Sequence, residues 1–392
     1  MDVFENGRGR VRRISVAAYL SKIFAAISPH QKSAAPTRSL PSPRRELVGI
    51  QYVRGAAALM VVLFHLKPQL EHLGYTVGPG AGLSGGVDAF FVISGLIMWI
   101  TTCDRAVSPL KFLNHRLVRI VPLYWITTTI MVAAMVVAPS VLQTARFDLN
   151  HIIASYTFIA WPHPTSGFMQ PVVFPGWTLN YEMFFYLIFS VLLLVRRSYR
   201  LVIAAVVFTA LPLIGAMFQN GLGHGALLDS QFKFYTSVNM LEFFVGMLLG
   251  EVFNRTRGLQ AIGSRFGLLF ALIGLVLLPI TADLFPDIPS IFSRGVPALL
   301  LVTGALACDV VGSVPRHWLP LLVGNASYSL YLMHPFVLSA TSQLWRKLHL
   351  TTSVPGLWVF SILSVGLCLV VAALSFWLVE TPLIAFFRKR RR

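Results

Sequence analysis

Charged residues are scarce in this sequence: they fill 12% of its 392 positions, while 56% are hydrophobic and the mean hydropathy is +0.71. Such a composition excludes an ordinary soluble globular domain. Cysteine is also rare, because only Cys103, Cys308 and Cys368 occur, far apart and without a Cys-x-x-Cys or Cys/His cluster. This pattern argues against a disulfide framework and a zinc site, so we expect no metal. No convincing internal repeat is present, which disfavours an inverted-repeat transporter.

Apolar runs are what the sequence has in abundance. About ten are long or apolar enough to cross a bilayer, so we predict an all-α integral membrane protein of about ten transmembrane helices. A shorter run near Ile152–Trp161 is more typical of an interfacial or re-entrant segment. The ten predicted spans are residues 48–67, 85–103, 117–138, 177–195, 200–218, 234–252, 266–282, 293–312, 322–345 and 355–379.

The basic residues predict the orientation of these spans. If the chain begins in the cytoplasm and crosses ten times, 25 of the 32 Lys and Arg residues lie on the cytoplasmic side. Arg54 lies within a span, and six lie outside: Lys67, Arg146, Lys233, Arg294, Arg346 and Lys347. The positive-inside rule demands such a bias, so we predict that both termini are cytoplasmic. The net charge of +17 is then an orientation signal toward anionic membrane lipids, and no nucleic-acid partner is expected.

The sequence divides into three parts. Residues 1–46 hold nine basic residues and a Pro/Ser/Arg-rich stretch, which favours a disordered cytosolic tail over a short amphipathic helix on the membrane. Residues 47–385 form one membrane domain, and residues 386–392 are a second basic cytosolic tail. The longest outer segment, Pro139–Pro175, is either a binding lid or an irregular connection.

Arg54 and His65 lie in one apolar run and are eleven residues apart. At 100° per residue they return to within ~20° of one direction, so both share a helix face, about 16 Å apart along the axis. An ionisable group in the bilayer costs several kcal/mol unless it is partnered. This pair therefore indicates a functional site.

Further ionisable residues lie in other spans. By the predicted topology, Asp88 and Glu182 share the outer third of the membrane with His65. A carboxylate at that depth can orient an imidazole that acts as a general base, or it can merely hold helices together. His334 is as well explained by a structural role as by a ligand role. Glu242 is expected to pair with a cation, for which Arg54 is one candidate.

Two motifs lie in neighbouring spans, one at the cytosolic start of the third span and one in the middle of the second. Arg116 and Arg119 share a helix face and form a fork that suits phosphate oxygens, although ordinary membrane anchoring explains them equally well. Ser94 and Gly95 lie mid-span, where small residues allow close approach of another chain or of a thin ligand.

Six segments in this order resemble the acyltransferase-3 family of integral membrane O-acyltransferases, over about residues 47–385. Without an extracytoplasmic esterase domain, the chain is most similar to the bacterial exopolysaccharide acetyltransferases. The segments are Arg54-x10-His65, Phe90-Phe-Val-Ile-Ser-Gly95, Arg116-Leu-Val-Arg119 with Ile120-x-Pro122-x-Tyr124, Trp177-Thr-Leu-Asn-Tyr-Glu182, Gly324-Asn-Ala-Ser-Tyr-Ser-Leu-Tyr-Leu-x-His334 and Val379-Glu-Thr-Pro382.

The resemblance implies ten helices in the bacterial inner membrane and acyl transfer from cytosolic acyl-CoA, with acetyl-CoA the expected donor. The implied acceptor is a hydroxyl of an extracytoplasmic or lipid-linked polysaccharide.

The resemblance also implies roles for single residues. His65 is the general base, Glu182 orients it, and Arg54 positions the acyl end. Arg116 and Arg119 hold a CoA phosphate group, and the pantetheine arm passes Ser94 and Gly95. Asp88, Glu242 and His334 remain substrate-binding or structural residues.

Two other classes of protein remain open. A proton-coupled exporter or flippase of lipid-linked sugars would also bury His, Glu and Arg, but it gives no reason for the arginine fork. A structural scaffold would not explain so many buried titratable groups.

Overall fold

The computed structural model describes residues 46–76, 80–103, 106–139, 146–218, 223, 225–255, 258–350 and 353–389. The chain divides into two units, Met1–Glu46 and Leu47–Arg392. The predicted N-terminal tail lies outside the described residues, except for Glu46. The second unit is the membrane domain considered below, and its last described helix extends to Lys389, into the predicted C-terminal tail.

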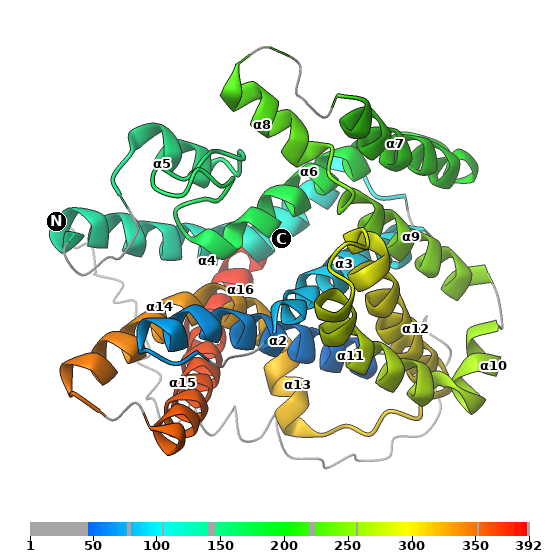
Figure 1. Ribbon diagram of the computed structural model, residues 1–392. Helices are drawn as coiled ribbons and strands as arrows, with labels where there is room; N and C mark the ends of the chain where they lie inside the picture. The colour runs from blue at the N-terminus through cyan, green and yellow to red at the C-terminus, as the bar shows by residue number, and fades with distance from the viewer. Residues whose placement is uncertain are drawn as a thin grey trace, which may run out of the picture. The chain divides into compact units, whose positions relative to one another are not determined.

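The described residues of this unit are helical, apart from turns, loops and an isolated antiparallel bridge between Pro162 and Met169 (Figure 1). The helices are α2 (Val48–His72), η1 (Ala81–Gly85), α3 (Gly86–Thr102), α4 (Pro109–Val137), α5 (Leu149–Tyr156), η3 (Phe174–Gly176), α6 (Trp177–Leu192), α7 (Arg197–Met217), α8 (Ala226–Tyr235), α9 (Met240–Arg255), α10 (Gly258–Arg265), α11 (Gly267–Leu284), η4 (Ile291–Gly295), α12 (Val296–Val311), α13 (Trp318–Asn325), α14 (Ser327–Lys347), α15 (Val354–Ser375), η5 (Phe376–Glu380) and α16 (Thr381–Lys389).

Eight helical runs among the described residues are long and apolar enough to cross a membrane: Val48–His72, Ala81–Thr102, Pro109–Val137, Arg197–Met217, Ala226–Asn254, Gly267–Leu284, Ile291–Val311 and Val354–Arg388. The other two predicted spans coincide with α6 and α14. Helix α6 has only 16 residues, and α14 carries many polar side chains, including His334. The all-α membrane fold is therefore found, while the count of ten and the cytoplasmic termini stay predictions.

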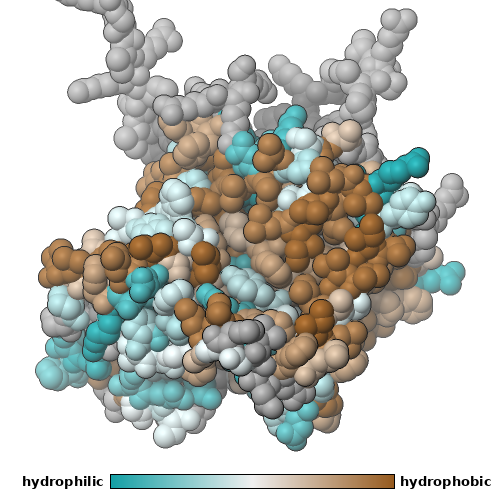
Figure 2. All heavy atoms as spheres, turned by 90° about the horizontal axis from the view of Figure 1, so that it is seen from above, coloured by the Kyte–Doolittle hydropathy of each residue, from teal (hydrophilic) through white to brown (hydrophobic). Residues whose placement is uncertain are grey.

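Burial separates the interior helices from those that face lipid. The apolar windows of α2 and α3 are 56% and 72% buried, whereas those of α7 and α11 are 11% and 17% buried. Figure 2 shows apolar residues gathered over a broad area of one face. An apolar surface of this size is stable only in contact with another apolar phase. We therefore assign α7 and α11 to the surface that contacts the lipid hydrocarbon chains, while α2 and α3 lie in the protein interior.

Helix α2 is held in the interior at both its start and its flank. The Asp309 carboxylate at the end of α12 accepts hydrogen bonds from the Gly49 and Ile50 amides, at 2.7 and 3.1 Å. It thereby satisfies donors that an α-helix leaves unpaired at its N-terminus. Along its length α2 packs beside α3, α12, α13 and α14. Arg54 and His65 therefore point into a crowded protein interior.

Helices α3 and α9 cross at backbone contact. A Cβ atom on Gly95 would lie 1.9 Å from the carbonyl oxygen of Phe243, and one on Gly246 would lie 2.1 Å from that of Val92. Each glycine therefore faces the backbone of the other helix. Such close approach is how small residues pack helices in membranes, where van der Waals contact replaces the hydrophobic effect.

Candidate active site

Two histidines meet inside the membrane domain. His65 in α2 and His334 in α14 stack with ring centroids 5.0 Å apart, and His65 Nδ1 lies 3.1 Å from His334 Nε2. His334 is fully buried and His65 is partly buried. Each Nδ1 also faces the carbonyl oxygen four residues earlier in its own helix, that of Val61 at 2.9 Å and that of Leu330 at 3.2 Å.

These contacts indicate which nitrogens carry protons. A carbonyl oxygen only accepts, so each Nδ1 carries its hydrogen and donates it to the backbone. The Nδ1–H of His65 then donates also to the unprotonated Nε2 of His334. His65 Nε2 is left with a free lone pair and no hydrogen bond to a described residue. This is the state that a general base requires.

The end of the outer segment covers the histidine pair. Phe174 of η3 lies edge-on to His65, with ring centroids 4.7 Å apart. The next turn is tied to α14, because the Tyr331 hydroxyl hydrogen-bonds the Pro175 carbonyl at 2.8 Å and the Thr178 hydroxyl at 2.7 Å. The segment predicted as either a binding lid or an irregular connection therefore ends against His65, and both interpretations stay predictions.

A second polar cluster surrounds Arg54, eleven residues before His65 in the same helix. The guanidinium donates to Gln51 Oε1 and to Ser327 Oγ, both at 2.9 Å. At ~1.5 Å per residue, this cluster and the histidine pair are about 16 Å apart along α2. They are two separate polar sites on one face of one helix.

Three guanidiniums meet in this cluster. Arg119 of α4 interacts electrostatically with Arg54 on one side and with Arg116 on the other. Two carboxylates, Glu182 and Glu380, face the three cations. Three guanidiniums and two carboxylates leave a net charge of one positive unit. An unpaired charge in the protein interior raises the free energy unless an anion neutralises it.

Several donors of this cluster are unused. The Nε of Arg116 is buried with no hydrogen-bond partner among the described residues, and its Nη2 makes only a 3.5 Å contact to Thr101 Oγ1. Arg119 makes no hydrogen bond to any residue that the structure describes. A buried charged donor without a partner costs about 1–3 kcal/mol or more. The cluster is therefore suited to binding a multiply charged anion such as a phosphate group.

Glu182 belongs to the arginine cluster. Its Oε1 accepts hydrogen bonds from Ser94 Oγ, at 2.7 Å, and from the Tyr186 hydroxyl. The predicted contact between Glu182 and His65 is therefore wrong, because His334 takes that position beside His65. The predicted shared depth of Glu182 and His65 is wrong as well, because Glu182 lies with Arg54, about 16 Å from His65 along α2.

Sequence reasoning missed three polar residues of the cluster: Gln51, Tyr186 and Ser327. Gln51 precedes Arg54 by three residues and Tyr186 follows Glu182 by four, so helix spacing alone places each on its neighbour's face. Ser327 comes from a distant helix, and no sequence signal links it to Arg54.

Asp88 and Glu242 form a third group, together with Arg294. Asp88 Oδ1 lies 3.6 Å from Arg294 Nε, and Glu242, which is 1% exposed, interacts with both residues. The expected cation beside Glu242 is thus present, but it is Arg294 and not Arg54. Arg294 was counted from the sequence only as an outer basic residue.

Gly95 was predicted to line the path of a cofactor. Its Cα instead faces the backbone of α9, where a Cβ would meet the Phe243 carbonyl. Of the two interpretations open for this glycine, close approach of another helix is the one that the structure supports. Ser94 remains in the site through its hydrogen bond to Glu182.

Comparison with known proteins gives a family for this arrangement. Residues 47–377 match the acyltransferase-3 family, described as an acyltransferase domain. The chain belongs to this family. It is 36% identical to the exopolysaccharide production protein ExoZ of Rhizobium meliloti, over 84% of this chain and 96% of that protein. No solved structure matches it.

More distant relatives of this acyltransferase-3 protein are larger. It is 24% identical to the peptidoglycan O-acetyltransferase OatA of Listeria monocytogenes over 87% of the chain, but spans only 56% of that protein. A putative O-acetyltransferase of Staphylococcus aureus is also 24% identical, over 88% of this chain and 58% of that protein. The predicted family is confirmed, and the protein is a multi-pass membrane O-acyltransferase.

The segments that resemble acyltransferase-3 motifs come together in space. Arg54 of the first motif meets Arg119 of the third, Glu182 of the fourth and Glu380 of the last. Ser94 of the second bonds Glu182. The motifs thus converge on the two polar sites along α2.

Proposed function

We propose that this enzyme moves an acetyl group from cytosolic acetyl-CoA to a hydroxyl of an extracytoplasmic or lipid-linked polysaccharide, in the inner membrane of a bacterium. The main support is the arginine cluster, whose excess charge and unused donors suit the phosphate groups of CoA. The names of two relatives support the acceptor and the acyl group, since one acts in exopolysaccharide production and the other O-acetylates peptidoglycan.

In this proposal the two sites on α2 divide the work. Arg54, Arg116 and Arg119 hold the phosphates of the donor, with Glu182 and Glu380 keeping the guanidiniums in place. The pantetheine arm extends from there toward the histidine pair, about 16 Å along the helix. The acyl thioester and the acceptor hydroxyl then meet beside His65.

The chemical step uses the free nitrogen of His65. As the acceptor oxygen attacks the thioester carbonyl, His65 Nε2 takes the hydroxyl proton. The C–O bond of the ester forms and the C–S bond breaks. The proton then passes to the sulfur of the departing CoA. His334 accepts the Nδ1–H hydrogen bond throughout and so stabilises the imidazolium that forms.

Binding of acetyl-CoA to the full-length protein in lipid nanodiscs tests the donor site. Charge-assisted hydrogen bonds are worth about 1.5–3 kcal/mol, so Arg119→Ala should weaken binding by roughly ten- to a hundredfold. Arg119→Lys should recover only part of the affinity, because an ammonium lacks the planar fork.

Lys111→Ala is the matched control, since Lys111 lies at the same end of α4 but is exposed. The affinity of the Lys111→Ala variant for acetyl-CoA should stay within about twofold of the wild-type affinity. If the Arg116→Ala/Arg119→Ala double variant binds acetyl-CoA as tightly as wild type, the cluster does not hold the donor.

A further inference from the structure

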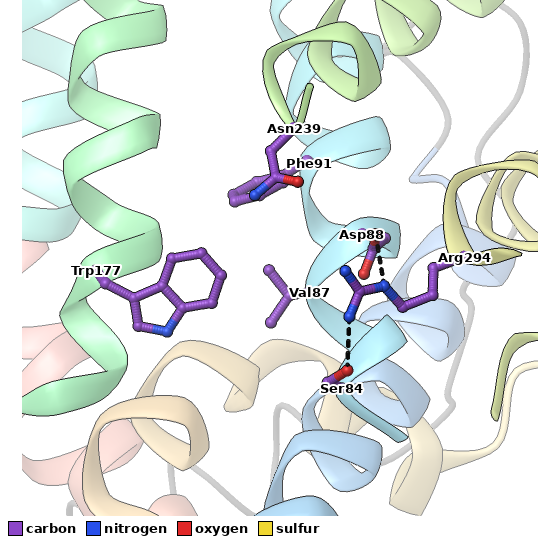
Figure 3. Close-up of a pocket in the computed structure, with 7 residues that line it drawn as sticks. All are labelled: Ser84, Val87, Asp88, Phe91, Trp177, Asn239 and Arg294. Carbon is purple, nitrogen blue, oxygen red and sulfur yellow. Dashed lines mark hydrogen bonds and ion pairs between the residues drawn. The ribbon is translucent and has the colours of Figure 1, made fainter. Parts of the chain in front are cut away.

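A pocket with a mixed polar lining includes Trp177, the residue that directly follows η3. Figure 3 shows Trp177 at the start of α6 facing Val87 and Phe91 of α3 across a gap. Asn239, just before α9, and the Asp88–Arg294 ion pair with Ser84 line the rest of the pocket.

Arg294 presents an unused donor to this gap. Its Nη1 hydrogen-bonds Ser84 Oγ at 3.0 Å and its Nε faces Asp88. The third guanidinium nitrogen points toward the gap and toward Trp177 (Figure 3). The pocket therefore offers a carboxylate that accepts, a guanidinium and an amide that donate, and one aromatic wall.

We infer that this pocket binds the edge of a neutral sugar residue of the acceptor, an inference that rests on the proposed function. Neighbouring hydroxyls of a sugar both donate and accept, which matches Asp88 with Arg294 and Asn239. The C–H face of the ring packs on Trp177. The cavity of about 40 Å³ admits about three or four hydroxyl-sized groups at ~10–15 Å³ each, so it takes one edge of a ring.

The charge around the pocket selects a neutral sugar over an acidic one. Arg294 already faces Asp88, and the buried Glu242 lies directly beside that pair. As long as at least one of these two carboxylates is ionised, the three residues together carry no net positive charge that would attract a uronate. An acidic sugar would have to displace Asp88 from Arg294 and would be repelled by it.

The position of the pocket suits an acceptor site. Phe174 covers His65, and Trp177 follows it by three residues, about 6 Å at ~2.0 Å per residue in a 3₁₀ turn. On α3, Val87 and Phe91 line the pocket, while Phe90 packs on Tyr331 beside His334. A sugar held in the pocket therefore lies next to the base that deprotonates its hydroxyl.

The test uses detergent-permeabilised membrane vesicles that contain the full-length protein, so that radiolabelled acetyl-CoA and the host's own extracted polysaccharide, at varied concentration, both reach their sides of the membrane. Trp177→Ala and Asn239→Ala should each raise the KM for polysaccharide by at least ~10-fold. Their KM for acetyl-CoA should stay within about twofold. Trp177→Tyr keeps an aromatic wall and should keep the acceptor KM within about threefold.

Trp358→Ala is the matched control, because Trp358 is 62% exposed on α15, and it should leave both constants unchanged. Methyl glycosides of glucose, galactose and mannose serve as competitors beside those of glucuronic and galacturonic acid. We expect at least one neutral glycoside to inhibit better than either acidic one.

The outcomes separate the two proposals. If wild-type vesicles label the polysaccharide but Trp177→Ala and Asn239→Ala keep the wild-type acceptor KM, the pocket is not the acceptor site and the proposed function stands. Preferential inhibition by the uronic acid glycosides also overturns the inference. If wild-type vesicles transfer no label, the proposed function fails, and this inference fails with it.

Discussion

His65 Nδ1 lies 3.1 Å from His334 Nε2, although 269 positions separate the two residues in the chain. Both rings donate Nδ1–H to their own helix, so the hydrogen bond between them runs from His65 to His334. This leaves Nε2 of His65 as the basic nitrogen and makes His334 the group that orients it. In the proposed mechanism, His334 would orient His65 as a carboxylate orients the imidazole in many hydrolases.

His65→Ala should therefore remove acyl transfer without removing donor binding. We expect the transfer rate to fall by at least ~10²-fold, the lower range for loss of a positioned base. The affinity for acetyl-CoA should stay within about twofold, since the arginine cluster lies about 16 Å away along α2. Transfer of radiolabel and nanodisc binding are measured on the same preparation. A well-expressed His65→Ala protein with wild-type transfer would exclude His65 as the base.

His334 should act as a positioning residue for His65, and two isosteres distinguish this from simple packing. The amide oxygen of a glutamine reaches where Nε2 stood, whereas that of an asparagine reaches only the Nδ1 position. His334→Gln should retain more transfer than His334→Asn, by about tenfold, with donor binding unchanged in both. Equal rates for the two variants would show that His334 only fills space.

The sequence predicted the membrane fold and most members of both polar sites, for a physical reason. A charged or titratable residue is so costly in an apolar helix that it stands out from its surroundings, as Arg54, His65 and Glu182 did. The resemblance of the motifs to a known family added the expected chemistry, acyl transfer. Length and hydropathy placed these residues inside the spans, but they put Glu182 at the depth of His65 when it lies with Arg54.

The contacts between helices could not be predicted in the same way. Periodicity predicts which residues share a face of a helix, but it does not predict which other helix that face contacts. From the sequence, His65 was therefore paired with Glu182, and Arg54 was offered as the cation beside Glu242. The structure pairs them with His334 and Arg294 instead. Arg294 was overlooked because the positive-inside rule already accounted for it as one of six outer basic residues.

Gly95 should be intolerant of any side chain, because a Cβ there would lie 1.9 Å from the Phe243 carbonyl. Gly95→Ala must push α3 away from α9, and overpacking of this kind typically costs about 1–3 kcal/mol. Gly366→Ala is the control, since a Cβ on Gly366 meets nothing within 4 Å. Thermal unfolding in detergent should show a lower midpoint for the first variant only. Equal midpoints would mean that the two helices can separate without loss of stability.

The direction of the domain in the membrane is also testable. A reporter fused after Lys67 should read as extracytoplasmic and one fused after Arg197 as cytoplasmic. In the opposite orientation, most Lys and Arg residues would lie outside the cytoplasm, against the positive-inside rule. This orientation places the arginine cluster toward acetyl-CoA and the histidine pair toward the acceptor. The opposite readings would reverse both assignments.

The outer segment carries a pH-sensitive contact of its own. His163 Nδ1 accepts hydrogen bonds from the Thr165 and Ser166 amides, at 3.3 and 3.4 Å, and its ring lies edge-on to His151. Burial lowers the pKa of His151, and burial together with the nearby His151 lowers the pKa of His163. The hydrogen bond of His151 to the Gln170 carbonyl, and then the nearby Asp148, oppose this lowering of the His151 pKa but do not reverse it.

Because both folded-state pKa values lie below the unfolded value of ~6.5, the unfolded segment binds more protons at mildly acidic pH. The stability of the segment is therefore fully present above about pH 6.5 and is lost as the pH falls below it. Protonation of His163 Nδ1 also removes the acceptor of the two amides. We expect the Thr165 and Ser166 amides to lose hydrogen-exchange protection at pH 5.5 relative to pH 7.5, after correction for intrinsic rates.

His163→Asn separates titration of this histidine from a general effect of acid. The asparagine Oδ1 takes the place of Nδ1 and accepts from the same amides, but it does not protonate in this range. The variant should keep similar protection of both amides at the two pH values. If the variant loses protection at pH 5.5 as far as wild type does, His163 is not the group that responds to pH, and His151 becomes the residue to substitute next.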